Sequence, residues 1–446
     1  MNKKLIIPKR IVCADEDNSI LDGSILEITG SHISDMRKFD SNYIMRFDGE
    51  VVHAENLTLI PGFVQTHLHL CQTLFRGLAD DLELLDWLQN KIFPMENSLD
   101  KNSLRASVRL GIYELLSGGT TTILDMGTLQ FQEVIFDELK LSGIRAFAGK
   151  CMIDENLLYT KFQSTKEYEL KYAYDLASEF HDTESGRIKY GFAPRFALSC
   201  TEGLLKETKE MMNDFPKSVF HTHSSESRNE CAEIRKKFGK DNIEYFESIG
   251  VLDQNSVLAH CVYVNENEID ILKKKNVSVA HCPSSNLKLG SGIANVPELI
   301  RKGIKVSIGA DGAPCNNNLS ALEEMKLASL IQKPIYGPTF MDARSIFRLA
   351  TIEGAAALNI GDITGSIEIG KKADLVLLDL ETPFMSLSDE PQNIYSNIVY
   401  SSSSANVASV MVDGNWVIRD KKSLNYDESE LFNTGKIELN KLLKRI

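Results

Sequence analysis

Between residue 60 and about residue 360, short apolar segments alternate with longer segments of helical periodicity. This alternation is typical of a parallel sheet whose strands are joined by crossover helices. Eight segments are expected as strands: Leu59–Val64, Thr121–Asp125, Ile144–Gly149, Ile188–Phe192, Ser218–His221, Ser256–Leu258, Val277–Ala280 and Lys305–Ile308. Eight such units predict an α/β fold in which the strands close into a (β/α)8 TIM-type barrel.

The two ends of the chain have a different pattern, with short apolar segments separated by polar turns. Val407–Val412 is followed by Asp413-Gly414, a dipeptide typical of a hairpin turn, and the first 58 residues have the same texture. Because chain termini often lie close together, we expect both ends to build one small β-sandwich beside the barrel. The expected domains are 1–58, 59–362 and 363–446, the last with a terminal amphipathic helix from about residue 430.

Charge and cysteine usage narrow the range of partners. With 49 Lys and Arg against 62 Asp and Glu, the chain of 446 residues carries a net charge of −13, which opposes binding to nucleic acid or to an anionic membrane. The eight cysteines form no Cys-x-x-Cys pair, so we expect reduced thiols. No signal peptide or long apolar segment is found. We therefore expect a cytoplasmic homo-oligomer that acts on a small molecule.

Several motifs with known chemistry do not occur. The chain has no Gly-rich phosphate loop, no His-Glu-x-x-His and no Gly-x-Ser-x-Gly. The sequence motifs that usually indicate phosphoryl transfer or serine hydrolysis are therefore missing.

Histidines gather instead at the ends of the predicted strands. His67 and His69 follow the first strand, and because alternate residues of a strand point the same way, their imidazoles can share one transition-metal ion. Other strands end in polar motifs that contain His221, His223, Glu226, His260, His281 and Asp311. In a barrel of this kind all strands end on the same face, where catalytic groups lie. The sequence therefore predicts one metal-containing site there.

Five segments carry a resemblance to a known family. They are Pro61–His69, His223-x-x-Glu226, Ala259–Val262, His281–Leu289 and Gly309–Asn318. Together they resemble the amidohydrolase superfamily, in its deaminase and chlorohydrolase branch, over nearly the whole chain. The resemblance implies that His67, His69, His223 and Asp311 bind one divalent ion, usually Zn²⁺ with Fe²⁺ as the alternative. Four ligands exceed the three usual for catalytic zinc, so a weaker ligand with a second role is expected at Asp311.

The same side chains can carry a hydrolytic deamination. A metal lowers the pKa of its water, and Asp311 can accept the proton that this water loses. Glu226 can protonate a ring nitrogen and then the leaving amine, and His260 can donate to the oxygen of the tetrahedral intermediate. The expected products are a carbonyl compound and ammonia. The roles of His221, His281 and Asp125 stay open, since buried histidines more often satisfy hydrogen bonds in the core.

The residues that would select the substrate resemble those of two different classes of deaminase. Glu96 falls where similar adenosine-type deaminases have a ribose-binding glutamate, and Phe75–Leu82 with Trp87 resembles deaminases of 5'-deoxyadenosine, methylthioadenosine and S-adenosylhomocysteine. Arg195 replaces a histidine of many such enzymes and, together with Gln72, is similar to guanine deaminases. We expect an adenine nucleoside as substrate. Guanine is the second hypothesis, a chlorotriazine the third, and a non-catalytic scaffold on the same fold the hypothesis from another class.

Overall fold

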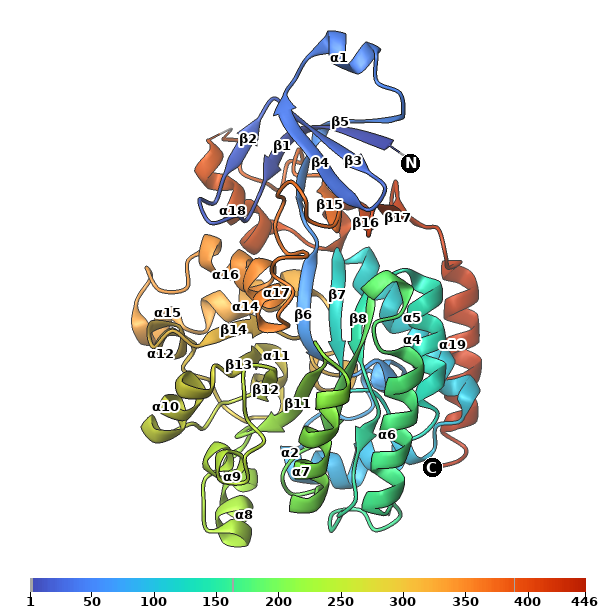
Figure 1. Ribbon diagram of the computed structural model, residues 1–446, viewed down its shortest axis with the longest axis vertical. Helices are drawn as coiled ribbons and strands as arrows, with labels where there is room; N and C mark the ends of the chain where they lie inside the picture. The colour runs from blue at the N-terminus through green and yellow to red at the C-terminus, as the bar shows by residue number, and fades with distance from the viewer. Residues whose placement is uncertain (1–2, 163, 389) are drawn as a thin grey trace.

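The computed structural model describes residues 3–162, 164–388 and 390–446, and its centre is a closed barrel (Figure 1). Eight parallel strands follow the order β11, β12, β13, β14, β6, β7, β8 and β10, and β10 pairs back with β11. Their bounds are β6 (Phe63–Leu68), β7 (Thr120–Asp125), β8 (Arg145–Ala148), β10 (Ile188–Pro194), β11 (Val219–Ser224), β12 (Ser256–His260), β13 (Ser278–His281) and β14 (Lys305–Ile308). The short β9 (Cys151–Met152) adds to β10. The expected barrel is confirmed.

One predicted strand is wrong in its bounds. The apolar run 59–64 contains a break, since β5 (Glu50–Pro61) ends in the small sheet and β6 begins at Phe63. A Cβ atom on Gly62, between them, would meet Thr121 Oγ1 at 2.1 Å, so only glycine fits this close approach. Residues on both sides of the break are buried, and hydropathy alone therefore shows one continuous strand.

Helices surround the barrel, and their first residues follow from capping. The predicted helices at 104–116 and 268–275 start earlier, as α4 (Lys101–Ser117) and α10 (Glu266–Lys275), because Asp100 and Asn265 accept backbone hydrogen bonds as N-caps. The other barrel helices are α5 (Gln132–Ser142), α6 (Lys166–Phe180), α7 (Glu202–Met211), α8 (Arg228–Phe238), α9 (Asn242–Ser248), α12 (Val296–Arg301), α14 (Ala321–Leu330), α16 (Ala343–Leu349) and α17 (Ile352–Ala357).

The barrel is filled by side chains. Six of its strands contribute to one apolar cluster that also includes residues of α17 and the segment after it, namely Val64, Leu124, Phe147, Val219, Val257, Ala280, Ala355, Leu358 and Ile360. Because the strands stand around a ring, a single cluster drawn from six of them lies inside the ring. Burial of unpaired polar groups in such an interior has a cost, so the partners of the polar groups described below matter.

The two ends of the chain share a second sheet of nine strands. Its order is β18, β17, β16, β15, β5, β1, β3, β4, with β2 paired to β1. The bounds are β1 (Lys3–Val12), β2 (Ile20–Asp22), β3 (Ser24–Thr29), β4 (His32–Lys38), β15 (Leu375–Leu378), β16 (Val407–Val412), β17 (Asn415–Arg419) and β18 (Lys422–Ser423). The sheet curls, since Ile33 N bonds to Lys371 O at 2.9 Å and brings β4 back towards the segment before β15.

The terminal helix α19 (Glu428–Leu442) lies along α4 of the barrel and not on the small sheet (Figure 1). Gly435 allows this contact, because a Cβ atom there would meet Leu110 Cδ1 at 2.7 Å. Beyond the helix, Arg445 Nε donates to Ser98 O at 2.8 Å. The end of the chain therefore stabilises the barrel.

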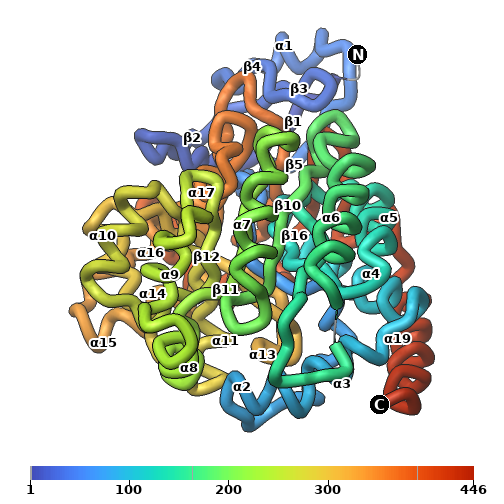
Figure 2. Tube along the Cα trace, turned by 60° about the horizontal axis from the view of Figure 1, so that its bottom comes forward, coloured from blue at the N-terminus to red at the C-terminus, as the bar shows by residue number. Residues whose placement is uncertain are grey.

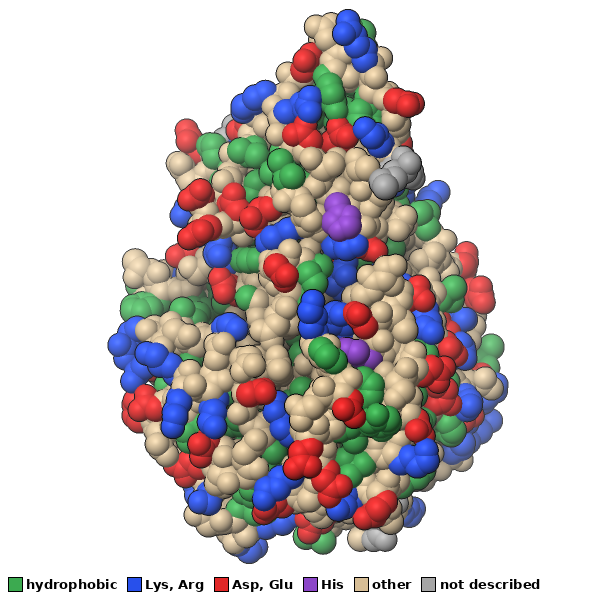
Figure 3. Space-filling model, in the orientation of Figure 1, with side chains coloured by type: hydrophobic (Ala, Val, Ile, Leu, Met, Phe, Trp, Pro, Cys, Tyr) green, Lys and Arg blue, Asp and Glu red, His purple; other side chains and the backbone are tan. Residues whose placement is uncertain are grey.

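The strands of the barrel point away from the small sheet. Two short helices, α2 (Leu84–Trp87) and α3 (Phe93–Asn97), lie at the opposite end of the molecule from that sheet (Figure 2). Acidic and basic side chains are interspersed on the face shown in Figure 3. In the described ranges, no helix combines the length and the apolar character needed to cross a membrane.

Candidate metal centre and active site

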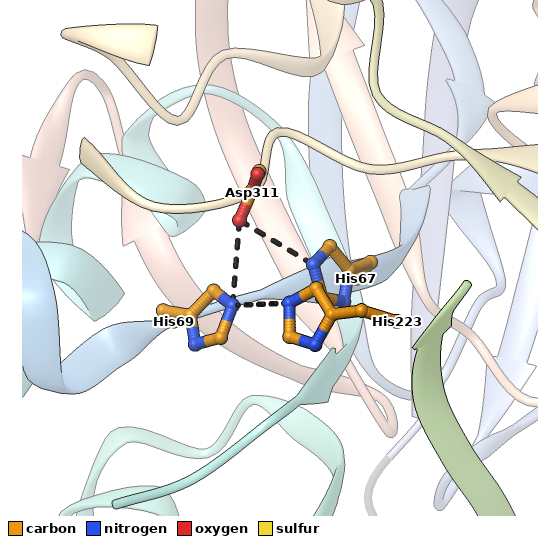
Figure 4. A group of neighbouring side chains, drawn as sticks. All are labelled: His67, His69, His223 and Asp311. Atoms are coloured by element: carbon orange, nitrogen blue, oxygen red, sulfur yellow. Dashed lines mark hydrogen bonds and ion pairs between the residues drawn. The ribbon is translucent and has the colours of Figure 1, made fainter. Parts of the chain in front are cut away.

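Four side chains from three strand ends converge on one point (Figure 4). His67 belongs to β6, His69 follows it directly, His223 belongs to β11, and Asp311 follows β14. Asp311 Oδ1 lies 3.3 Å from Nε2 of His67 and 3.3 Å from Nε2 of His69. His69 Nε2 is 3.2 Å from His223 Nε2. The barrel thus brings together the residues that the sequence predicts as ligands.

The spacing of these atoms fits a single divalent ion. Tetrahedral ligands with bonds of about 2.0–2.1 Å are separated by about 3.3–3.4 Å, which matches the distances above. His67 Nε2 is buried and has no hydrogen-bond partner among the residues that the structure describes. Burial lowers the pKa of all three histidines, so the neutral rings that a metal requires are favoured. Imidazole and carboxylate ligands together suit zinc or iron.

Hydrogen bonds behind the predicted ligands fix the orientation of two rings. His67 Nδ1 lies 2.8 Å from His221 Nε2, and His223 Nδ1 lies 2.7 Å from the backbone oxygen of Arg195. Such partners hold the second ring nitrogen in its N–H form and leave Nε2 free for a metal. The structure therefore places His221 against the ring of His67, a predicted ligand.

Glu226 and His260 stand next to the four predicted ligands. His260 Nε2 lies 3.5 Å from Glu226 Oε2 and 3.9 Å from Asp311 Oδ2. His260 reaches this point because the backbone turns sharply at the end of β12, with φ of 74° at His260 and 47° at Cys261. Non-glycine residues adopt positive φ rarely, and they do so mostly at constrained sites.

The carboxylates differ in protonation. Burial, the charge of Asp311 and the charge of Glu230 raise the pKa of Glu226 well above its usual value, so the proton-bearing form is favoured. Burial alone would raise the pKa of Asp311 too, but its close neighbour His67, with Nε2 3.3 Å from Oδ1, holds that pKa well below its usual value. The site therefore contains one carboxyl group suited to donate a proton and one suited to accept it.

A cavity opens beside these groups, with about 400 Å³ of empty space, part of it open to solvent. Its lining includes Gln72, Trp87 and Arg195. Glu96 is not one of the lining residues, because it lies behind two of them. Gln72 Nε2 donates to Glu96 Oε1 at 2.7 Å, and Arg195 Nη1 donates to Glu96 Oε2 at 2.8 Å. Three of the four residues predicted for substrate binding, Glu96, Gln72 and Arg195, thus form one buried network, and Trp87 lines the cavity beside it.

Other residues lining this cavity were not assigned from the sequence: Leu84, Leu88, Phe196 and Glu230. Glu230 accepts hydrogen bonds from the backbone N–H of Glu226 at 2.6 Å and of Ser227 at 3.3 Å. The sequence signal for Glu230 is the capping box that it forms with Ser227 at the start of α8. Glu230 lies four residues after Glu226.

The two remaining open residues have different surroundings. Asp125 accepts from Leu70 N at 2.8 Å and Gly127 N at 3.0 Å, which holds the turn directly after His69, and burial raises its pKa to about 7. His281 is 1% exposed, and neither ring nitrogen has a partner among the described residues. Burial lowers the pKa of His281 to about 3, so its ring is neutral.

Comparisons with known proteins agree with this geometry. Residues 58–417 match the amidohydrolase family. A 5'-deoxyadenosine deaminase of Methanosphaera stadtmanae is 38% identical over 394 residues, which cover 88% of this chain and 90% of that protein. An adenosine deaminase from Xanthomonas campestris, solved with bound zinc, superposes with a TM-score of 0.91 at 26% identity and covers 99% of each chain.

A solved guanine deaminase from E. coli is also similar, with a TM-score of 0.81, 26% identity, and coverage of 94% of this chain and 98% of that one. The match to the family extends over most of the chain and includes every strand of the barrel. The chain therefore belongs to the amidohydrolase family, whose members are hydrolases.

Proposed function

We propose that this protein deaminates an adenine nucleoside, such as 5'-deoxyadenosine, methylthioadenosine, S-adenosylhomocysteine or adenosine. Water adds at C6 of the purine, the C6–N bond breaks, and ammonia and the inosine analogue are released. The observation that carries this proposal is the convergence of His67, His69, His223 and Asp311 next to Glu226 and His260. The deaminase names of the relatives support the same reaction.

The proposed metal centre consists of the three histidines and Asp311. A bound divalent ion would supply the nucleophile by lowering the pKa of a water molecule towards neutrality. We favour Zn²⁺ over Fe²⁺, since the similar adenosine deaminase was solved with zinc. Elemental analysis of protein purified without added metal tests this, and we expect about one zinc per chain from the single cluster of ligands.

Each neighbouring side chain has a proposed step. Asp311 Oδ2, the carboxylate oxygen nearer His260, accepts the proton of the attacking water. Glu226, whose raised pKa favours the protonated form, donates to N1 of the purine and later delivers a proton to the leaving amine. His260 Nδ1 lies 2.9 Å from Asn286 Oδ1, and with this amide turned so that its N–H₂ group donates to Nδ1, Nε2 carries the ring hydrogen and can donate it to the oxygen added at C6.

The network around Glu96 supports a nucleoside but also favours a second candidate. A carboxylate has about four acceptor sites, and Gln72, Arg195 and, at 3.9 Å, Cys71 Sγ occupy three of those on Glu96, so capacity for one ribose hydroxyl remains. Guanine deamination is the second candidate, because Gln72 and Arg195 both line the cavity and both are hydrogen-bond donors that a purine carbonyl requires.

An ammonia-release assay separates these functions. The wild-type protein is offered the four adenine nucleosides, guanine and cytosine with ammonia as the readout, and a chlorotriazine with released chloride as the readout. Glu226→Gln is the control that reveals a contaminating enzyme. We expect turnover of at least one adenine nucleoside at the highest kcat/KM of the panel. Efficient turnover of guanine with no turnover of any nucleoside would overturn the proposal in favour of the second candidate.

We also propose that the protein works in the cytoplasm as a homo-oligomer. All eight cysteines are buried and free, which suits a reducing compartment. On α14, α15 (Lys333–Tyr336) and the segment that follows, Leu330, Ile335 and Phe340 expose 45%, 54% and 47% of their surface, and such apolar groups are typical of contacts between subunits. Size-exclusion chromatography with light scattering gives the mass and tests the oligomer.

A further inference from the structure

Three consecutive polar residues follow β13 after Cys282 and Pro283, and two of them contact the catalytic groups. Ser285 Oγ donates to Asp311 Oδ2 at 2.6 Å, and Asn286 Oδ1 lies 2.9 Å from His260 Nδ1. Both side chains are buried. This segment, which starts α11 (Pro283–Lys288), therefore orients the proposed base and the proposed oxygen-stabilising histidine together.

The first residue of the triplet is held by a carboxylate from a distant helix. Glu324 on α14 accepts from Ser284 Oγ on Oε1 at 2.5 Å and from Ser284 N on Oε2 at 3.2 Å. Its side chain is 0% exposed and takes no part in the chemistry described above. Glu324 therefore ties the start of α11 to the outer layer of helices.

The same carboxylate also holds the segment that carries Asp311. Asn316, in α13 (Ala313–Asn316), donates to Glu324 Oε1 at 2.8 Å and to the backbone oxygen of Ala310 at 2.8 Å. Ala310 is the residue before Asp311. Glu324 thus connects the loops after β13 and β14, which are the two loops that must keep a fixed distance for Ser285 to reach Asp311.

We propose that Glu324 is a positioning residue for the reaction, which acts through Ser285 and Asn286 on Asp311 and His260. It contacts neither the ligands nor the cavity, so its effect is indirect. Three donors, namely Ser284 N–H, Ser284 O–H and the Asn316 amide, converge on its two oxygens. A carboxylate satisfies all three because it only accepts, whereas a glutamine in its place turns an N–H towards one of the donors.

The test compares Glu324→Gln with Glu323→Gln, the same change at an exposed neighbour on α14 that contacts Asn318. This inference rests on the proposed deamination for its kinetic part. We expect Glu324→Gln to lower kcat by about 10- to 100-fold, the usual effect of removing a partner behind a catalytic centre, with bound metal retained. Glu323→Gln is expected to stay within about twofold of the wild type, as for surface changes away from such features.

A double-mutant cycle shows whether Glu324 affects kcat through Ser285 and Asn286. In a Ser285→Ala, Asn286→Ala background, Glu324→Gln should change kcat by less than about threefold, because the path it acts through is already broken. The same loss in both backgrounds would overturn the proposal, and so would wild-type kcat in Glu324→Gln. If Glu324→Gln does not fold, Ser284→Ala removes one of the three bonds and must still lower kcat, or the proposal fails.

A spectroscopic readout keeps this inference separate from the proposed function. In the Co²⁺-substituted protein, the visible absorption bands report the geometry of the ligands, one of which is Asp311. We expect the bands to shift in Glu324→Gln and in Ser285→Ala but not in Glu323→Gln. Unchanged bands in Glu324→Gln contradict the positioning role. A wild-type protein without deaminase activity contradicts only the proposed function, since the spectral comparison needs no substrate.

Discussion

Replacing Glu96 by alanine is expected to destabilise the protein as well as impair the site. The change removes the acceptor of three hydrogen bonds, from Gln72 Nε2 at 2.7 Å, from Arg195 Nη1 at 2.8 Å and from the weak donor Cys71 Sγ at 3.9 Å. The ion pair is deeply buried, with 4% of the Arg195 side chain and 2% of the Glu96 side chain exposed. Removing one partner of a buried pair leaves an uncompensated charge, and this lowers the free energy of unfolding by about 3–5 kcal/mol.

The expected loss of stability in Glu96→Ala comes from the uncompensated charge of Arg195 and not from lost packing. A second variant separates these two causes. In the double variant that combines Glu96→Ala with Arg195→Met, no charge stays buried without a partner. Because apolar replacement of a buried ion pair is often close to neutral, the free energy of unfolding should recover by about half or more of the loss. Urea denaturation of the metal-loaded wild type and of both variants gives the three values.

Activity measurements on the same variants add a functional test. Because Glu96 holds both Gln72 and Arg195, its loss should raise KM for every substrate that these donors contact, whether or not the substrate has a ribose. A free energy of unfolding within about 1 kcal/mol of the wild type in Glu96→Ala, the size of one ordinary hydrogen bond, would refute the buried-pair reasoning. A KM raised for nucleosides alone would show that Glu96 binds the sugar directly.

Three further predictions concern the metal centre and the contact between the two sheets. Asp311→Asn should lower kcat by about 10²- to 10⁴-fold at saturating metal, the contribution of a general base, as measured by ammonia release. His221→Ala, which removes the partner of His67 Nδ1, should weaken metal binding by about 10- to 100-fold in a chelator competition, with Asn359→Ala as a surface control. Arg145 binds both oxygens of Asp374 across the two sheets, at 2.7 and 3.1 Å, so Asp374→Asn should lower urea resistance at pH 7. Burial would raise the pKa of Asp374, but Arg145 holds this pKa below its usual value. The stabilisation by the ion pair is therefore complete above the unfolded pKa of about 3.9 and disappears as the pH falls through the lower folded pKa. The difference in urea resistance between Asp374→Asn and the wild type must shrink over the same pH range.

The fold and the cluster of polar residues at the strand ends could be predicted because their signals are local, whereas the choice of ligands among these residues came from the resemblance to the family. A strand and the polar residue at its end occupy neighbouring positions, and the barrel brings the ends of all its strands to one face. His67, His223 and Asp311 could therefore be recognised without knowledge of any contact between them. The alternation of apolar segments likewise reports burial, which each segment shows by its own composition.

The tertiary structure alone decided which partners these groups have. Glu96 and Arg195 are 99 residues apart, and Glu324 is 40 residues from Ser284, so no periodicity relates them. Glu96 is predicted from its position as a sugar ligand, yet its carboxylate is bound by two side chains that stand between it and the cavity. Hydrogen bonds of this kind depend on the exact placement of buried groups, which the packing of the whole chain determines.

The junction between the two sheets shows the same division. The run 59–64 is apolar throughout because both sheets bury it, so the sequence alone determines that these residues are inside. It does not determine that Pro61 belongs to one sheet and Phe63 to the other, since that depends on the pairing of β5 with β15 and of β6 with β7. Local composition thus determines burial, and only long-range pairing decides which sheet each strand joins.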